Sequence, residues 1–201
     1  MKKQIISAAV LCALVSGSAL AAEQGPWLVR ARAVQLNSAN GDSTGLGLSI
    51  NDKTIPEVDI TYFFDKNLAA ELVLTVPQKH TLSSNGTAIG TVKHLPPTLT
   101  AQYHFDAGSF QPYVGAGVNY THFSDFTVTP AVAAALSPSI SKDSFGLALQ
   151  VGVDIPLSNN LSLNFDVKKV SIATDVYSFG TKAGTFKVNP LLVGVGLGWR
   201  F

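Results

Sequence analysis

Cysteine is nearly absent from this 201-residue chain, in which Cys12 is the only example. Disulfide bonds within the chain therefore contribute nothing to its stability, even in a compartment that permits them. Charged residues are scarce as well, at 13%, against 46% hydrophobic residues. With 14 basic residues, 13 acidic residues and no basic patch, the chain lacks the electrostatic surface that a nucleic-acid partner needs.

Long apolar runs are also missing, except at the N-terminus. There a basic MKK precedes an apolar stretch over residues 5–15, and the segment ends in ALA at 19–21. This pattern predicts a signal peptide over residues 1–21 and a mature chain of residues 22–201. Cys12 lies within the apolar stretch and follows Leu11 rather than a small residue, so lipidation is not expected.

No run of about 18 apolar residues follows the signal peptide, which excludes a spanning helix. An exported chain this apolar has two main options, a soluble β-barrel or sandwich and a transmembrane β-barrel. The closing PLLVGVGLGWRF favours the second option, because it alternates apolar with mostly small or polar residues. Nothing follows it to cover the apolar face, so a lipid-facing strand fits better.

Eight segments alternate in this way, each about as long as the roughly 9 to 11 residues that a tilted membrane strand needs. They span residues 26–36, 53–64, 67–76, 92–105, 110–122, 143–156, 161–171 and 187–201. Tight turns at 65–67, 106–109 and 157–160 alternate with long gaps near 37–52, 77–91, 123–142 and 172–186. This pattern is typical of barrels with short periplasmic turns and long extracellular loops.

The two faces of each strand distinguish the soluble from the membrane barrel. Over residues 145–155 large apolar side chains share one face, whereas Gly146, Ala148, Gln150, Gly152 and Asp154 share the other. Large side chains from eight strands would overfill a small interior, so the apolar face must point to lipid. We therefore predict an all-β, eight-stranded antiparallel transmembrane β-barrel in the outer membrane of a Gram-negative bacterium.

The inward positions are predicted to form two layers. A polar plug fills the periplasmic side and the middle, where opposite charges should pair because unpaired buried charges are costly. Its members are Arg30, Arg32, Glu57, Asp59, Glu71, Gln102, His104, Asp154, Asp166 and Arg200. An apolar upper lumen lies toward the long loops and consists of Val34, Leu36, Ile55, Val73, Pro96 and Leu192. Either layer is explained by packing alone, but together they predict a small apolar ligand that enters from outside.

Two prolines interrupt the fourth predicted strand. Pro96 and Pro97 each remove a backbone donor from the ladder. One interpretation is a bulge or bend. The other is a lateral exit, through which an apolar molecule stopped by the polar plug would leave the lumen for the lipid.

The motifs VKHLPPTL at 92–99, AQY at 101–103 and PYVGAGVNY at 112–120 together resemble the OmpW family of outer-membrane proteins. NLAAEL at 67–72, QVGVD at 150–154 and GWRF at 198–201 extend the resemblance over essentially the whole mature chain. The resemblance implies an eight-stranded barrel with a hydrophobic channel for small hydrophobic molecules, as in the alkane-uptake branch of that family.

Within this resemblance, Val73 falls where an apolar residue constricts the channel, whereas Lys168 stands where a bulky aromatic lining residue is expected. A lysine there would snorkel to the mouth or pair with Asp166 or Glu71, and either would make the lumen less dry. The C-terminal Phe201 suits recognition by the barrel-assembly machinery. The other predicted partners are outer-membrane lipids and small hydrophobic molecules.

Two other classes of function stay open. An enzyme would need a histidine beside a carboxylate or serine at the mouth, and only His94 and His122 lie near such residues: Ser124, Asp125 and Asp143. A structural, adhesive or receptor barrel would act through its loops, where the alanine-rich stretch 129–139 could form a short helix over the mouth. No motif indicates a metal or an organic cofactor.

Overall fold

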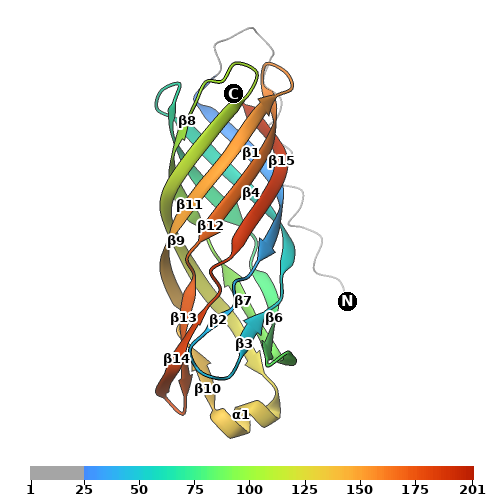
Figure 1. Ribbon diagram of the computed structural model, residues 1–201, viewed down its shortest axis with the longest axis vertical. Helices are drawn as coiled ribbons and strands as arrows, with labels where there is room; N and C mark the ends of the chain where they lie inside the picture. Colours follow the sequence, from blue (N-terminus) through green and yellow to red (C-terminus); the bar gives the residue numbers. More distant parts are fainter. Residues whose placement is uncertain (1–24) are drawn as a thin grey trace, which may run out of the picture.

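A closed β-barrel forms most of the molecule (Figure 1). The computed structural model describes residues 25–201; the predicted signal peptide, residues 1–21, and Cys12 lie outside the described residues. The barrel strands are β1 Trp27–Asn37, β4 Lys53–Phe63, β5 Leu68–Thr75, β8 Thr98–His104, β9 Gln111–Val128, β11 Asp143–Pro156, β12 Leu161–Val170 and β15 Leu191–Arg200. Each pairs antiparallel with the next, and β15 closes the barrel onto β1, which confirms the predicted fold class.

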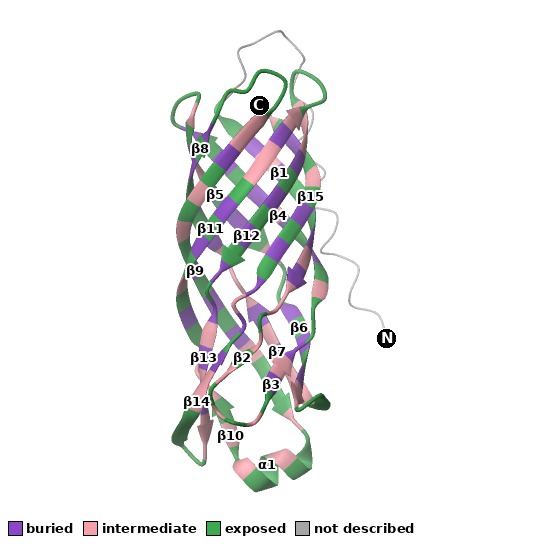
Figure 2. Ribbon diagram, viewed as in Figure 1, coloured by how far each residue is buried: buried purple, intermediate pink, exposed green. Residues whose placement is uncertain are grey.

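Alternating side chains build this wall, because successive residues of a strand point to opposite faces. On β11, Phe145, Leu147 and Leu149 are 81%, 69% and 63% exposed, whereas Ala148 and Gln150 are buried inside the barrel. The same alternation of exposed and buried bands runs along the barrel strands in Figure 2. The large apolar side chains therefore face outward, as a lipid-facing surface requires.

Aromatic rings mark the two edges of this lipid-facing belt. At the short-turn end the rings of Trp27 and Tyr62 are 4.8 Å apart, and at the opposite edge Tyr120 lies 4.9 Å from Phe145. Beyond the second edge the outward side chains become polar or charged: Lys79, Lys93, His122 and Ser124. The strands beyond Tyr120 therefore lie outside the membrane, on the extracellular side.

The four long connections contain strands, in addition to the short helix expected within one of them. They hold β2 Gly41–Asp42, β3 Leu48–Ile50, β6 Gln78–Ser84, β7 Thr87–Leu95, β10 Pro138–Ile140, β13 Ala173–Ser178 and β14 Thr181–Lys187. These strands extend the wall beyond the membrane, in the lower half of Figure 1. The reason lies in short runs such as Leu46, Leu48 and Ile50, which alternate apolar residues with small ones and so form strands as well.

The predicted strand over residues 92–105 is two strands. β7 ends at Leu95 and β8 begins at Thr98, because Pro96 and Pro97 have no N–H to donate to a ladder. Both strands nevertheless pair with the same edge of the long strand β9, which runs past the break. The two prolines therefore interrupt the strand, but β7 and β8 continue along the same edge of β9.

One short helix lies at the extracellular end of the described chain. α1, Pro130–Leu136, forms within the alanine-rich stretch where a helix is expected. Ser178 Oγ and the Phe179 N–H donate to the Leu136 carbonyl at 2.9 and 3.1 Å, so the β13–β14 hairpin holds the helix in place. No helix among residues 25–201 is long and apolar enough to cross a membrane.

Candidate functional site

Two arginines of β1 form the centre of the polar plug. Arg30 donates to both carboxylate oxygens of Asp154 at 3.1 and 2.6 Å, and its Nη1 lies 3.0 Å from Asp59 Oδ1. Arg32 Nη2 lies 2.7 Å from Asp59 Oδ2 and 3.1 Å from Glu71 Oε1. All five side chains are buried, so these ion pairs replace the hydration that the charges lose inside the barrel.

Uncharged polar side chains complete the network. Tyr113 of β9 donates its hydroxyl proton to Asp166 Oδ2 at 2.8 Å, and Gln150 Nε2 donates to the same oxygen at 2.7 Å. Sequence reasoning missed Tyr113. The available signal was the pairing of Tyr113 on β9 with Gly152 on β11. A side chain at position 152 would collide with the Tyr113 ring, so the glycine leaves room for it.

The periplasmic end of the plug is aromatic. His104 stacks on Tyr113 with ring centroids 4.9 Å apart, and its Nε2 lies 3.0 Å from Gln102 Oε1. The Arg200 guanidinium lies over the Phe63 ring at 3.9 Å and donates to the backbone carbonyl of residue 25. Among the described residues Arg200 forms no ion pair, so it belongs to the plug by position and not by charge pairing.

Lys168 lies buried at the top of the plug. Its Nζ is 3.3 Å from Glu57 Oε1 and 3.8 Å from Asp166 Oδ1, and its side chain is 1% exposed. Of the two expected partners, Asp166 is present, but the shorter contact is to Glu57. Glu71 instead pairs with the arginines, and the ammonium group does not reach the mouth. Lys168 and Glu57 thus form a charged floor under the upper lumen.

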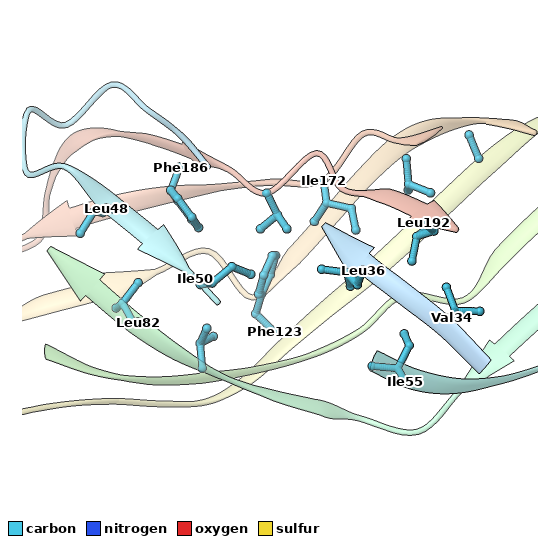
Figure 3. Packing of buried hydrophobic residues seen from close by; sticks show 14 of the residues in the cluster. Val34, Leu36, Leu48, Ile50, Ile55, Leu82, Phe123, Ile172, Phe186 and Leu192 are labelled. Carbon is cyan, nitrogen blue, oxygen red and sulfur yellow. The ribbon is translucent and has the colours of Figure 1, made fainter. Parts of the chain in front are cut away.

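The apolar upper lumen begins directly above this floor. Val34, Leu36, Ile55, Val73 and Leu192 are buried, and Pro96 is partly buried beside them. All of these residues except Val34 border one cavity of about 20 Å³, which also contacts Lys168 and Asn119. The labelled side chains of Val34, Leu36, Ile55 and Leu192 lie close together in Figure 3. The space is narrow, little more than a water molecule requires.

The wall beside Pro96 and Pro97 is paired on one side only. Toward β9, Asn119 Nδ2 bridges the break, because it lies 3.2 and 3.1 Å from the carbonyl oxygens of the two prolines. Toward β5, the ladder with β8 ends at the pair Val73 and Thr98. β5 continues beyond this pair with β4 as its only described neighbour, so backbone hydrogen bonds do not close that side.

A second, larger cavity lies at the extracellular end and is here called the outer cavity. Its volume is about 50 Å³, and its lining residues are Leu46, Leu48, Ile50, Leu82, Ile89, Val92, His94, Phe123, Phe126, Val128, Val132, Leu136, Pro138, Ile140, Thr174, Val176, Phe186 and Val188. Figure 3 shows Leu48, Ile50, Phe123 and Phe186 in one cluster with Leu36 and Leu192 of the upper lumen. Sequence reasoning missed this cavity because it lies in the segments expected to be loops.

Two histidines are stacked at the outer cavity, and one of them, His94, lines it. His80 of β6 and His94 of β7 are buried and stack with centroids 4.7 Å apart and an interplanar angle of 11°. His80 Nδ1 lies 2.9 Å from the Asn51 carbonyl oxygen, whereas neither ring nitrogen of His94 has a hydrogen-bond partner in residues 25–201. Burial, with a smaller contribution from His80, lowers the pKa of His94 to about 3, so its ring is neutral at physiological pH.

The other histidine of the possible enzyme site points outward. His122 Nδ1 lies 2.8 Å from Asp143 Oδ1, which also accepts a hydrogen bond from Tyr120 at 2.6 Å. In the part of the chain that the structure describes, Ser124 is hydrogen-bonded to neither residue, so this pair has no positioned nucleophile. No group of three or more His, Cys, Asp or Glu among residues 25–201 is arranged to hold a metal ion.

Comparison with known proteins agrees with this geometry. The model of the OmpW family matches residues 23–201. The chain belongs to the OmpW family. Outer membrane protein W of Escherichia coli (strain K12) is 36% identical over 212 residues, which covers 100% of both chains. Outer membrane protein AlkL of Ectopseudomonas oleovorans is 33% identical over 178 residues, which covers 83% of this chain and 74% of AlkL.

A solved structure supports the same assignment. The crystal structure of the outer membrane protein OprG from Pseudomonas aeruginosa matches this OmpW-family barrel with a TM-score of 0.76 and 26% identity, over 89% of this chain and 97% of OprG. The relatives and this structural neighbour are outer-membrane proteins, which confirms the predicted outer-membrane location and the resemblance found in the sequence motifs.

Proposed function

We propose that this OmpW-family barrel passes small hydrophobic molecules from the cell exterior into the outer membrane. The observation that carries the proposal is one apolar cluster that spans both cavities. It runs from Leu48 and Phe186 of the outer cavity, past Phe123 and Ile172, to Leu192 of the upper lumen. An apolar molecule in this cluster loses contact with water, which is favourable by about 25 cal/mol per Å² of buried apolar surface.

The polar plug directs the exit to the side. Arg30 and Arg32 join carboxylates from three other strands at 3.1 Å or less, and Lys168 and Glu57 cover them. An apolar molecule moving down the axis would have to separate these buried charges, which is strongly unfavourable. The side of the wall without a backbone ladder, between β5 and the two prolines, lies at the same height as Val73. The molecule leaves there into the lipid.

Charge placed in the upper lumen tests this route. We expect Val73→Asp and Leu192→Lys each to slow the entry of an apolar fluorescent probe about tenfold or more, because a charge in an apolar environment costs about 2 kcal/mol or more. The measurement is the rate of probe entry into vesicles that carry lipopolysaccharide in the outer leaflet and the purified barrel.

Thr87→Asp, at the exposed tip of the β6–β7 hairpin, adds a charge outside both cavities and should leave the rate unchanged. Heat-dependent gel mobility verifies that every variant is a folded barrel. Equal rates in the wild type and in both lumen variants would contradict the channel and favour a barrel that acts through its extracellular strands alone.

A further inference from the structure

We propose that His94 binds the hydroxyl or carbonyl group of an otherwise apolar, uncharged ligand in the outer cavity. This inference rests on the proposed function and narrows its substrate class. The barrel would then prefer molecules such as medium-chain alcohols to hydrocarbons of the same length.

The outer cavity offers almost no polar side chain besides His94. Thr174 is the other one, but its Oγ1 already donates to the Ser141 carbonyl at 2.7 Å. The remaining lining side chains are aliphatic or aromatic. Both His94 ring nitrogens lack a partner in residues 25–201, although nearly all buried polar atoms in native proteins have one. Among the side chains that line the outer cavity, His94 is therefore the one with unpaired hydrogen-bonding atoms in residues 25–201.

Packing alone does not account for a histidine at this position. The His94 ring stacks on His80 and meets the edge of Phe123 at a centroid distance of 6.2 Å and an angle of 72°. A phenylalanine would make the same two ring contacts and would bury no unsatisfied nitrogen. The difference between the two side chains is the hydrogen-bonding capacity that the folded protein leaves unused.

Water and metal ions are poor occupants. A buried water needs two to four polar partners, whereas the lining of the outer cavity supplies essentially one. A metal ion bound by both histidines would have to lie in the plane of each ring. The two planes are stacked nearly parallel, so no nearby point lies in both, and His80 Nδ1 is already engaged by the Asn51 carbonyl.

The chemistry of a neutral imidazole defines the ligand. One ring nitrogen donates a proton and the other accepts one, so a hydroxyl group can bind either nitrogen and a carbonyl group can bind the N–H. A charged ligand would lose its hydration in this apolar cavity without finding a counter-charge in its lining. The matching ligand is therefore uncharged, mostly apolar and equipped with one hydrogen-bonding group.

Competition between two ligands of equal length tests the inference. In lipopolysaccharide-containing vesicles, 1-octanol and octane compete with an apolar fluorescent probe for passage, and the inhibitory concentration of each is expressed as its concentration in the membrane. We expect the wild type to be inhibited by 1-octanol at a concentration about fivefold to tenfold lower than by octane, because a buried polar group disfavours a ligand that cannot pair with it.

His94→Phe should abolish this preference, so that 1-octanol and octane inhibit probe passage at about the same concentration. The matched control is His122→Phe, which alters an outward histidine and should retain the wild-type preference. Equal inhibition by both ligands in the wild type, or a preference that survives His94→Phe, would overturn the inference and leave the proposed function intact. Probe passage that does not depend on the wild-type barrel at all would overturn both.

A second measurement does not depend on the folding of a variant. In wild-type barrel labelled with ¹⁵N-histidine, 1-octanol should shift the ring nitrogens of His94, whereas octane should shift them much less. Identical spectra with both ligands would contradict the inference even if His94→Phe failed to fold.

Discussion

The two halves of the barrel interior share one wall and differ in the density of their ion pairs. In the polar plug, Arg30 and Arg32 each contact two or more carboxylates. The outer cavity has a volume of about 50 Å³, and His94 in its lining has no hydrogen-bond partner among the described residues. A dense network of buried ion pairs favours one closed arrangement, whereas a cavity beside an unpaired imidazole has features that a ligand can use.

A single ion pair, between Lys168 and Glu57, separates the two halves. Lys168 and Glu57 face the apolar upper lumen from below, and both border its cavity of about 20 Å³. This pair therefore belongs to the plug by charge and borders the proposed ligand route by position. Substitutions in the plug should therefore change mainly the stability of the barrel, and substitutions in the cavities should change mainly the passage of a ligand. Substitutions at the boundary should change both.

The largest effect is expected from breaking the plug. Arg30→Met leaves Asp154 buried without its cation and Asp59 with Arg32 alone, and uncompensated buried charges of this kind typically cost about 3 to 5 kcal/mol. The free energy of unfolding, measured by urea titration of the barrel in lipid vesicles, should fall by that amount. Lys66→Met, in an exposed turn, is the control and should change it little. A loss below about 1 kcal/mol for Arg30→Met would show that the network is not what holds this half together.

A smaller, mixed effect is expected at the boundary. Lys168→Met removes the buried ammonium group, but Glu57 keeps Arg32 Nε at 3.0 Å, so the loss of stability should be only about 1 to 3 kcal/mol. The upper lumen then has a less polar floor, and the apolar probe should enter the vesicles faster. Lys169→Met, the adjacent outward position, is the matched control. Unchanged or slower entry with Lys168→Met would mean that the charged floor does not limit the route.

The smallest effect is expected at the extracellular hairpin beside the helix. Hydrogen bonds from Lys182 and Thr185 lower the pKa of the partly exposed Asp175 carboxyl group. Because the folded pKa lies below the unfolded value, these contacts stabilise the β13–β14 hairpin above about pH 4 and are lost as the pH falls through the folded pKa.

Amide hydrogen exchange in β14, corrected for its intrinsic pH dependence, should therefore accelerate in acid, and Asp175→Asn should remove that change. Exchange that is equally pH-dependent in both proteins would assign the effect to another group.

Much of the barrel could be predicted from period-two alternation, because lipid-facing and buried residues differ in polarity. Phe145 on β11 is an apolar lipid-facing residue, and Arg30 on β1 is a charged buried one. The ion-pair partner of Lys168 could not be predicted in this way. Lys168 lies on β12 and Glu57 on β4, two strands that are separated by β15 and β1, so their meeting depends on the register of every pair between them.

The outer cavity was missed for a different physical reason. Most of its strands are short and lie in segments that the sequence pattern predicts to be loops. Leu46, Leu48 and Ile50 nevertheless keep the same alternation, and so do Thr174 and Val176. Strands of three to nine residues carry too few repeats for the pattern to stand out in isolation. What stabilises them is pairing with long neighbours such as β9, which reaches Val128.

The most direct test is a crystal structure of the barrel grown with 1-bromooctane, in which anomalous scattering locates the bromine. The account predicts bromine in the outer cavity beside Phe123 or in the upper lumen between Val73 and Pro96, and none below Lys168. Bromine among Arg30, Asp59 and Asp154, or bound only to the outer surface of a well-ordered barrel, would contradict it.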